Sequence, residues 1–379
     1  MAIIEKEVTL PSQTPGASHR LLSYTFSGRP GSHARSVYIQ AGLHADEHPG
    51  LLVIQHLLTR LQALDDADGI LGRIVVRPFA NPVGMGQRVF GHLAGRFNLD
   101  NGENYNRFFP DITEALKDSL AEEPVAHNDV AEVKRRFARL MAPLTSPDTV
   151  GAGKHQLLSD AFEHDLVLDL HCDSDAALHL YSTTNQAERS LRLSRCLGIE
   201  AIFLEDDSSN APFDEAYSNA WRVVQKVGVV DADKVGFSCT VELRGQADIN
   251  DELAEADAEG ILRFLAEEGV IEGDLGAATH QAGEPQIYPL TGVAPIKATT
   301  SGIVIYKKAL GESVRKGEVV AEVAPLDQGI NPPRERILSP ADGVMVVRHL
   351  IKLVRPGQRL ALLAGKEPLP DRKGNLLGD

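Results

Sequence analysis

The chain has 379 residues, of which 43% are hydrophobic and 24% are charged. This length and composition are those of a globular protein with room for one large domain and a smaller one. The formal net charge is −15, because 53 acidic residues outnumber 38 lysines and arginines. A surface with this charge repels phosphate backbones, so the sequence argues against a nucleic-acid partner.

The cysteines, the N-terminus and the apolar segments bear on the cell compartment. Cys172, Cys196 and Cys239 are odd in number and fit no zinc-ribbon spacing, so we expect free thiols in a reducing environment. The first ten residues are charged at three positions and contain no apolar run of signal-peptide length. No stretch approaches the ~20 apolar residues that a membrane-spanning helix needs. We therefore expect a cytoplasmic protein that does not enter a membrane.

Strand-like and helix-like segments alternate over about the first 270 residues. Apolar residues at helical spacing follow Pro49, a residue suited to the first turn of a helix. The alternation predicts an α/β sandwich with a largely buried sheet and functional residues at strand ends. The expected elements are, in chain order, a strand over residues 36–43, a helix over 49–64, a strand over 74–79, a charged helix over 125–140, strands over 165–172, 201–204 and 239–243, and an acidic helix over 249–269.

The segment from about residue 111 to residue 164 separates two of the expected strands. It can form a lid, an interface or a helix on the solvated surface. Its charged helical pattern does not separate these possibilities, and we expect the solvated helix.

An internal repeat follows the point near residues 276–296 where helical patterning stops. Short strand-like runs recur, and glycine returns after 15 residues between Gly302 and Gly317 and after 14 between Gly343 and Gly357. A repeat of this kind predicts a small β domain of two similar halves. It resembles the barrel-sandwich hybrid of biotinyl and lipoyl domains, which carry their cofactor on a lysine between the halves. Residues 324–341 contain no lysine, so we expect a structural or specificity role instead.

A histidine and a glutamate follow the first buried strand. His44 and Glu47 are three residues apart before a helix, so both can point at one cation, and His171 ends a strand about 125 residues later. Two histidines and a glutamate are the three-ligand set of a catalytic zinc, which keeps water in its fourth position. Zinc lowers the pKa of that water to about 7 and polarises a carbonyl. Taken singly, His44 with Glu47 can be a surface pair, and His171 can be a satisfied core histidine.

A third strand end carries Glu242, whose carboxylate can take a proton from water and pass it to a leaving amine. Between the possible ligands, residues 81–110 form a loop by composition. The arginines of this loop can clamp a carboxylate in bidentate fashion. The alternative is a surface loop with solvated arginines. It fits poorly with the Asn, Phe and Pro residues around Asn106 and Arg107.

The motifs H-x-x-E, N-P-x-G, R-F, N-x-N-R-x-F-P, D-L-H and V-E occur in this order within residues 36–270. Their combination resembles the succinylglutamate desuccinylase/aspartoacylase family of the zinc carboxypeptidase-like superfamily. The resemblance implies a zinc-carboxypeptidase-like sandwich with a mixed central sheet and one zinc ion per chain. One departure is Ala45-Asp46, where the family often has Gly-Asn. This aspartate can orient a ligand or change the charge of the site.

The resemblance also implies the catalytic roles. His44, Glu47 and His171 match the zinc ligands, and Glu242 matches the general base that later acts as the general acid. Arg96 matches the arginine expected to polarise the scissile carbonyl and to stabilise the oxyanion.

Substrate-binding and supporting residues follow from the resemblance and from strand geometry. Asn106 and Arg107 match the family's pair that binds the substrate carboxylate. Side chains two apart on a strand share a face, so Asp169 can support the third ligand and Arg244 can meet an acidic group of the substrate. Cys172 faces the other way and belongs in the core. Three further histidines match no ligand position: His48, His164 and His179.

The sequence therefore predicts a zinc hydrolase that cleaves the amide bond of a small N-acyl amino acid or related compound. The expected catalytic domain covers residues 1–275, and the expected β domain covers residues 290–379. One alternative is a metallocarboxypeptidase acting on short peptides, which would use the same groups. A second is a non-catalytic small-molecule binding protein. The loss of a catalytic position would favour that second alternative, and none is lost. A homo-oligomer is possible, because family members with an appended β domain are often oligomeric.

Overall fold

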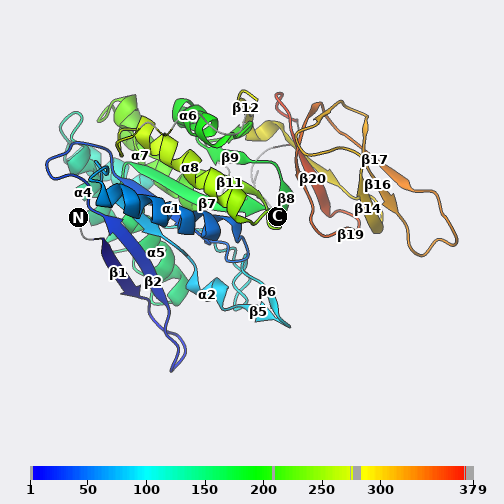
Figure 1. Ribbon diagram of the computed structural model, residues 1–379, viewed down its shortest axis with the longest axis horizontal. Coiled ribbons are helices and arrows are strands. Elements are labelled where there is room, and N and C mark those ends of the chain that lie inside the picture. The colour runs from blue at the N-terminus through cyan, green and yellow to red at the C-terminus, as the bar shows by residue number, and fades with distance from the viewer. Residues whose placement is uncertain (1–2, 207–209, 274, 276–282, 371, 373–379) are drawn as a thin grey trace.

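The computed structural model describes residues 3–206, 210–273, 275, 283–370 and 372. A nine-stranded sheet runs through the larger part of the molecule, with helices on both of its faces (Figure 1). In spatial order its strands are β1 (Ile4–Thr9), β2 (Arg20–Phe26), β4 (Ile74–Arg77), β3 (Val37–Ala41), β7 (Leu166–Asp173), β11 (Phe237–Gly245), β9 (His179–Ser182), β10 (Ala201–Leu204) and β12 (Gln286–Pro289).

The sheet is mixed, and its centre is parallel. β4, β3, β7 and β11 pair parallel to one another, so their carboxyl ends meet at one edge. β1, β2 and β9 add antiparallel pairings on either side. The predicted α/β fold with a mixed central sheet is confirmed. All five predicted strands are present, within a few residues of their expected ends.

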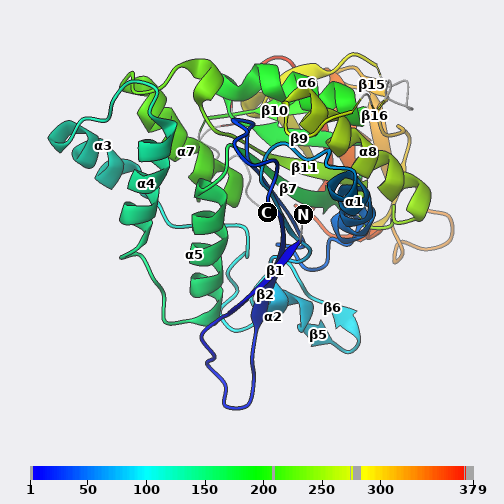
Figure 2. The same ribbon diagram turned by 60° about the vertical axis from the view of Figure 1, so that its left-hand side comes forward.

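Helices cover the sheet in two layers, which lie on opposite sides in Figure 2. Each layer closes its own apolar core against the sheet. Along β7, Leu166, Leu168 and Leu170 belong to the first core, whereas Val167 belongs to the second. The first layer contains α1 (Pro49–Asp66), α6 (Ala187–Leu197) and α8 (Asp251–Glu267), and the second contains α3 (Thr113–Glu122), α4 (Val130–Met141), α5 (Thr149–Phe162) and α7 (Phe213–Lys226).

The expectation that the 111–164 segment forms a solvated surface helix is wrong. The segment folds into α3, α4 and α5, whose apolar sides build the second core. Phe137 of α4 and Phe162 of α5 pack with ring centroids 4.8 Å apart. The expected start of the helix at residue 125 is also wrong, because α4 begins at Val130 behind Asp129, whose side chain accepts a hydrogen bond from the backbone N–H of Glu132.

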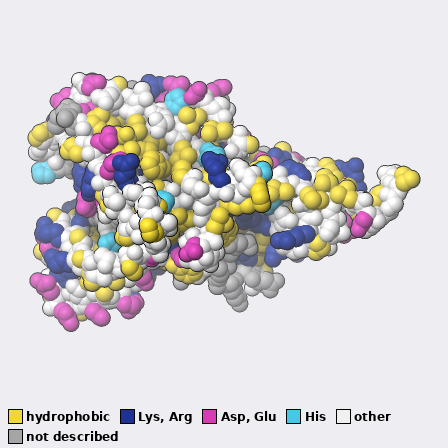
Figure 3. Space-filling model, turned by 90° about the horizontal axis from the view of Figure 1, so that it is seen from below, with side chains coloured by type: hydrophobic (Ala, Val, Ile, Leu, Met, Phe, Trp, Pro, Cys, Tyr) yellow, Lys and Arg dark blue, Asp and Glu magenta, His cyan; other side chains and the backbone are white. Residues whose placement is uncertain are grey.

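The chain after β12 is built of strands in two further sheets. This C-terminal β region projects from the rest of the molecule (Figures 1 and 3). One sheet has the order β13 (Val293–Lys297), β20 (Arg359–Ala364), β18 (Gly343–Arg348) and β15 (Ser313–Val314). The other has the order β17 (Glu335–Leu338), β16 (Val319–Ala324), β14 (Gly302–Tyr306) and β19 (Leu353–Val354).

The predicted repeat is visible in the pairing of these strands. β14, β15 and β16 come from its first half, and β18, β19 and β20 come from its second. Each short middle strand pairs with the other half, because β15 lies beside β18 and β19 lies beside β14. The two halves therefore form one interlocked unit around a shared core.

The C-terminal β region is attached to the main sheet next to β7. β8 (Asp175–Ala176) follows β7 after one residue and pairs antiparallel with β18. Arg348 of β18 donates from Nε and Nη2 to the two carboxylate oxygens of Asp175, at 3.1 and 3.3 Å. Small elements complete the described part: α2 (Pro82–Met85), β5 (Arg88–Val89), β6 (His92–Leu93) and three 3-10 turns at Thr184–Gln186, Ala232–Lys234 and Leu290–Gly292.

Candidate metal centre and active-site cavity

The strand ends at the centre of the sheet bring the predicted residues together. His44 and Glu47 lie in the turn between β3 and α1, and His171 lies near the end of β7. Gly42 allows the turn after β3, since its φ of +69° is a conformation that favours glycine. Glu242 of β11 is directly opposite His171 in the parallel pairing. Residues far apart in sequence thus meet at one edge of the sheet.

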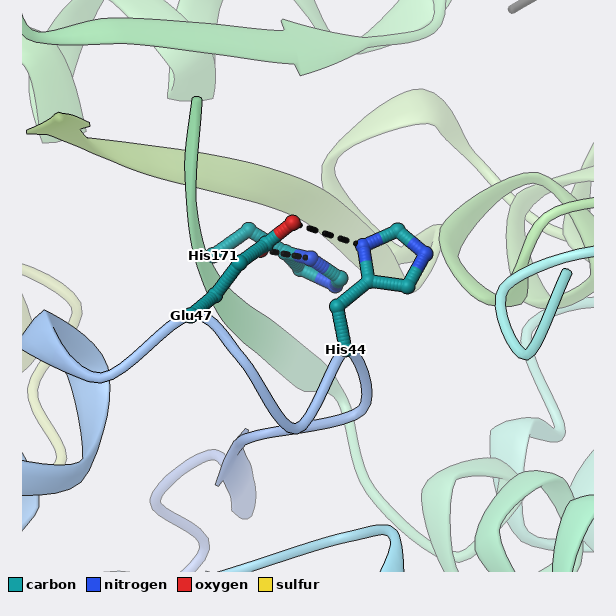
Figure 4. A group of neighbouring side chains, drawn as sticks. All are labelled: His44, Glu47 and His171. Atoms are coloured by element: carbon teal, nitrogen blue, oxygen red, sulfur yellow. Dashed lines mark hydrogen bonds and ion pairs between the residues drawn. The ribbon is translucent and has the colours of Figure 1, made fainter. Parts of the chain in front are cut away.

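Glu47 lies between the two histidines, as Figure 4 shows. Its Oε1 is 2.8 Å from His44 Nδ1, and its Oε2 is 2.8 Å from His171 Nδ1. The candidate ligand atoms of the three side chains all lie within 4.8 Å of one another. All three residues are buried. Two imidazole nitrogens and a carboxylate gathered in this way suit a divalent transition-metal ion such as zinc.

The remaining ring nitrogens of both histidines are held by neighbours. His171 Nε2 is 2.9 Å from Asp169 Oδ2, as the strand alternation predicts. His44 Nε2 is 2.8 Å from Asn104 Oδ1. A metal-binding histidine needs such an acceptor on its second nitrogen, which fixes the ring and leaves Nδ1 for the ion. The donor set and its supports therefore fit a metal, and Asn104 is a supporting residue that the sequence did not assign.

The charges inside the cluster shift its pKa values strongly. Burial alone would raise the pKa of Glu47, but the neighbouring imidazoles of His44 and His171 outweigh burial and lower it well below the ordinary value. Burial would lower the pKa of His171, yet Asp169 and Glu47 raise it well above that of free histidine. Burial and the nearby Arg96 lower the pKa of His44. The site therefore holds an anionic carboxylate between two imidazoles of different basicity.

Glu242 lines the same cavity and differs in environment from Glu47. Its Oε2 is buried and has no hydrogen-bond partner among the residues that the structure describes. Burial, and next the charge of Glu47, raise the pKa of Glu242 well above that of an ordinary carboxyl group. A carboxylate with a raised pKa beside a candidate metal site is suited to accept and return a proton.

Arg96 lies against the cluster. Its Nη1 is 3.0 Å from Glu47 Oε1 and 3.2 Å from His44 Nδ1. The preceding Gly95 permits this approach, because a Cβ at that position would lie 2.4 Å from the backbone nitrogen of Asp46. The guanidinium thus lies beside the candidate metal ligands His44 and Glu47.

Asn106 and Arg107 line the cavity on the long loop. Asn106 Oδ1 accepts a hydrogen bond of 2.9 Å from the backbone N–H of Phe213, which fixes the amide. The loop is braced from α5 by the buried Lys154, which pairs with Glu103 and donates to the carbonyl oxygen of Arg107 at 2.7 Å. The 111–164 segment therefore supports the site, a role that the sequence did not reveal.

Arg244 is the predicted site residue that the structure places elsewhere. The pairing of β11 with β7 shifts register between Glu242 and Gly245, and Arg244 has a φ of +62°. This irregularity breaks the alternation that would have put Arg244 beside Glu242. Its guanidinium pairs with Asp257 of α8, and Arg244 is not among the described residues that line the cavity.

The cysteines and the three histidines that match no ligand position lie outside the candidate ligand set. Cys172 is buried, and its backbone N–H donates to Glu47 Oε2 at 3.0 Å. All three cysteines are free thiols. His48 precedes the first turn of α1. The buried His164 and His179 each direct Nδ1 at a backbone carbonyl oxygen. Burial lowers the pKa of His164 to about 3.

The cavity around the cluster has a volume of about 710 Å³, which suits a small molecule. Residues of the C-terminal β region and of the main sheet line it together. Asp46, which the sequence singled out, also lines the cavity, together with several acidic residues that it did not single out: Asp173, Glu205, Asp214 and Glu215. Burial, and next the charge of Asp169, raise the pKa of Asp214 to about 6.

The amino-acid sequence is similar to a known protein family and to a named relative. The succinylglutamate desuccinylase/aspartoacylase catalytic domain matches residues 33–144. The N-alpha-acetyl-L-2,4-diaminobutyric acid deacetylase of Halomonas elongata is 26% identical over 339 residues, which cover 86% of this chain and 81% of that protein.

Solved structures extend the likeness to nearly the whole chain. A protein from Shewanella frigidimarina, described as belonging to the succinylglutamate desuccinylase/aspartoacylase group, superposes with a TM-score of 0.85 at 26% identity, covering 96% of this chain and 97% of that one. A family protein from Shewanella amazonensis gives 0.84 at 27% identity, covering 95% and 98%.

The fold and the comparisons define an enzyme of the deacylase class, which acts on amide bonds. More narrowly, the chain resembles the succinylglutamate desuccinylase/aspartoacylase family, whose catalytic-domain model matches residues 33–144. The resemblance seen in the sequence is thereby confirmed. Among the helices of the described residues, none is long and apolar enough to cross a membrane.

Proposed function

We propose that the protein is a zinc-dependent deacylase that hydrolyses the amide bond of a small N-acyl amino acid. The observation that carries this proposal is the buried His44–Glu47–His171 cluster, which lines the same cavity as Glu242. The relative from Halomonas elongata, whose name is that of an N-acetyl amino acid deacetylase, supports the substrate class.

His44 Nδ1, Glu47 and His171 Nδ1 would hold the ion. Bound zinc lowers the pKa of water and polarises a carbonyl group. Asp169 and Asn104 keep the two imidazoles in the required orientation through their outer ring nitrogens.

The chain's own residues would carry the proton and the charge. The Glu242 carboxylate accepts a proton from the attacking water and returns it to the departing amine nitrogen. The Arg96 guanidinium donates to the carbonyl oxygen as negative charge develops on it. The Asn106 amide and the Arg107 guanidinium hold the substrate carboxylate, so that the amide carbon lies over the cluster.

A metallocarboxypeptidase would use the same groups on a longer substrate. The C-terminal β region lines the cavity together with the catalytic residues, and this extra wall favours a small substrate over a peptide chain. We infer that the β region, expected over residues 290–379, is a barrel-sandwich hybrid that serves this role. Its division from a catalytic domain over residues 1–275 stays a prediction, as does a cytoplasmic location.

The test is release of amine from a panel of N-acetyl, N-formyl, N-succinyl and N-aspartyl amino acids and of short peptides. We expect hydrolysis of one N-acyl class, and we expect a chelator to abolish it. Cleavage of peptides alone would move the protein to the carboxypeptidases. A protein that holds no metal and turns over nothing would be a binding protein instead.

A further inference from the structure

A row of buried polar side chains crosses three strands behind His171. Arg77 of β4, Gln40 of β3 and Asp169 of β7 are direct cross-strand partners, so their side chains lie next to one another on one face of the sheet. Tyr38 lies two residues before Gln40 and shares this face. All four side chains belong to buried residues. Polar groups buried in this way cost stability unless each of them is hydrogen-bonded.

These side chains form one continuous chain of hydrogen bonds. Arg77 Nε donates to the Tyr38 hydroxyl at 2.9 Å, and this hydroxyl donates to Gln40 Oε1 at 2.9 Å. Gln40 Nε2 donates to Asp169 Oδ1 at 3.0 Å. The other oxygen of this carboxylate, Oδ2, lies 2.9 Å from His171 Nε2. The chain of hydrogen bonds therefore ends on the carboxylate that holds a candidate metal ligand.

Arg77 fixes the direction of every hydrogen bond in this chain. A guanidinium has donors only, so the Tyr38 oxygen accepts from it and has one proton left to donate. Burial raises the pKa of the Tyr38 hydroxyl, so this proton stays on the oxygen at neutral pH. Only the oxygen of the Gln40 amide can accept that proton, which turns the amide nitrogen toward Asp169. The carboxylate is therefore offered an N–H donor and not a second oxygen.

The Arg77 end of the chain is anchored in the second helical layer. Arg77 Nη2 pairs with Asp160 of α5, and Nη1 donates to the carbonyl oxygen of Leu22 at 3.3 Å. Asp160 also accepts a hydrogen bond of 2.8 Å from Gln156 on the same helix. α5 and α1 lie on opposite sides of the sheet in Figure 2. A buried network in which every polar atom is bonded makes its surroundings rigid.

We propose that Gln40, held by Tyr38 and Arg77, is a positioning residue that fixes the Asp169 carboxylate and through it the ring of His171. The proposal rests on the metal-dependent part of the proposed function. None of the three residues of the network before Asp169 is among the described residues that line the cavity, so their effect on the reaction would pass through the metal site alone.

A positioning role and a purely structural role predict different results when the network is broken. A structural role predicts a loss of stability and nothing else. A positioning role predicts weaker zinc binding as well, because Asp169 would no longer hold the His171 ring in the orientation that leaves Nδ1 for the ion.

The test is the zinc affinity of the full-length protein, measured by competition with a chelator of known affinity. Gln40→Met keeps the approximate length of the side chain and removes the amide. Its zinc dissociation constant should rise by about tenfold, which is the lower end of the cost of replacing a residue behind a metal-binding histidine. At saturating zinc, KM for a hydrolysed substrate should be unchanged, because the cavity lining is intact.

A second variant, Tyr38→Phe, removes a single oxygen from the network. The Gln40 amide then loses the donor that sets its direction, so zinc affinity should fall in the same direction by a smaller factor. This variant carries the test if Gln40→Met does not fold. Thermal unfolding of each metal-free protein measures the change in stability separately from the change in zinc affinity.

The matched control is Gln186→Met. Gln186 is also buried, and its amide is hydrogen-bonded to three serines of neighbouring elements. This variant should lose stability and keep the zinc affinity of the wild type. The positioning role is overturned if the folded variants Gln40→Met and Tyr38→Phe bind zinc as the wild type does. It is also overturned if Gln186→Met weakens zinc binding as much as Gln40→Met.

Zinc binding needs no turnover, so failure of the positioning role can be told from failure of the proposed function. Weaker zinc binding by Gln40→Met but not by Gln186→Met would support the positioning role even if no N-acyl amino acid is hydrolysed. Hydrolysis with unchanged zinc affinity in Gln40→Met and Tyr38→Phe would support the function and reject the positioning role. A wild-type protein that binds no zinc would reject both.

Discussion

At the scale of single residues, the site depends on one carboxylate that joins two distant strand ends. Glu47 contacts His44 within its own turn and His171 on β7. The pKa of Glu47 stays low only because both imidazoles are close. Glu242, a short distance away on β11, has the opposite shift. The opposite shifts fit the two roles proposed for these carboxylates, which are metal ligand for Glu47 and proton carrier for Glu242.

The role of Glu242 is tested by Glu242→Gln. The amide keeps the shape of the side chain but accepts no proton, so turnover should fall by roughly 10²- to 10⁴-fold, with zinc content unchanged. Because burial raises the pKa of Glu242, the acidic limb of the wild-type pH–rate profile should lie above the ordinary pKa of glutamic acid. Rates and zinc content are measured on the same samples.

The control is Glu205→Gln, which neutralises another carboxylate of the cavity lining and should retain most activity. A Glu242→Gln protein with substantial turnover would remove Glu242 from the mechanism.

Residues of the candidate site could be predicted from the sequence where they belong to a short motif with a fixed spacing. The spacing of His44 and Glu47 and the strand-end position of His171 were sufficient to predict the cluster. Asn104 was not predictable, since its contact with His44 depends on how a long loop folds back. Arg244 was misplaced because two-residue alternation fails at a strand irregularity, and nothing in the local sequence marks that irregularity.

At the scale of elements, the two-residue strand β8 connects the candidate metal site with the C-terminal β region. It follows β7 directly, pairs with β18, and carries Asp175, which binds Arg348 through both oxygens. Lys352 Nζ also lies 3.5 Å from Asp175 Oδ2. The position of the cavity wall relative to His171 therefore depends on a very short pairing and its ion pairs.

Asp175→Ala should loosen this connection. The partly exposed ion pair should contribute about 1 kcal/mol or less to the free energy of unfolding. The stability of the protein should therefore fall only slightly. KM for the substrate should rise severalfold, because the cavity wall loses its fixed position, while zinc content stays the same. Arg334→Ala removes an ion pair with Glu322 within the same β region and serves as the control. Equal effects of the two substitutions on KM would contradict the positioning role.

Some long elements were predicted, whereas the helices α6 and α7 and the short or edge elements were not. The predicted helix after Pro49 is α1, because apolar spacing and an N-terminal proline agree. The hairpin of β1 and β2 was missed, since its mostly exposed edge strand shows no clear apolar alternation. β8 has two residues, too few to carry any pattern. The sequence repeat predicted β strands. It did not predict that each short middle strand pairs with the other half of the repeat, because that pairing depends on the tertiary structure.

At the scale of the whole molecule, the main sheet, α7 of the second helical layer and the C-terminal β region line one cavity. The helices of the 111–164 segment pack against the sheet and brace the loop of Asn106 and Arg107 through Lys154. Residues of the C-terminal β region also line the cavity. From net charge and composition we expected no nucleic-acid or membrane partner. Neither property indicated which parts of the chain would line the same cavity.

The central claim is that His44, Glu47 and His171 bind one catalytic metal ion. It is tested most directly by titrating metal-free protein with zinc while bound zinc, released protons and amide hydrolysis are recorded at several pH values. Asp169 and Glu47 raise the pKa of His171, and this histidine must lose its proton to bind a metal. Zinc affinity should therefore rise with pH through the neutral range, with proton release accompanying binding.

Activity should appear in proportion to bound zinc and saturate at one ion per chain, and His171→Ala should gain neither zinc nor activity. Full hydrolysis by the metal-free protein, or equal zinc binding by the wild type and His171→Ala, would contradict the central claim.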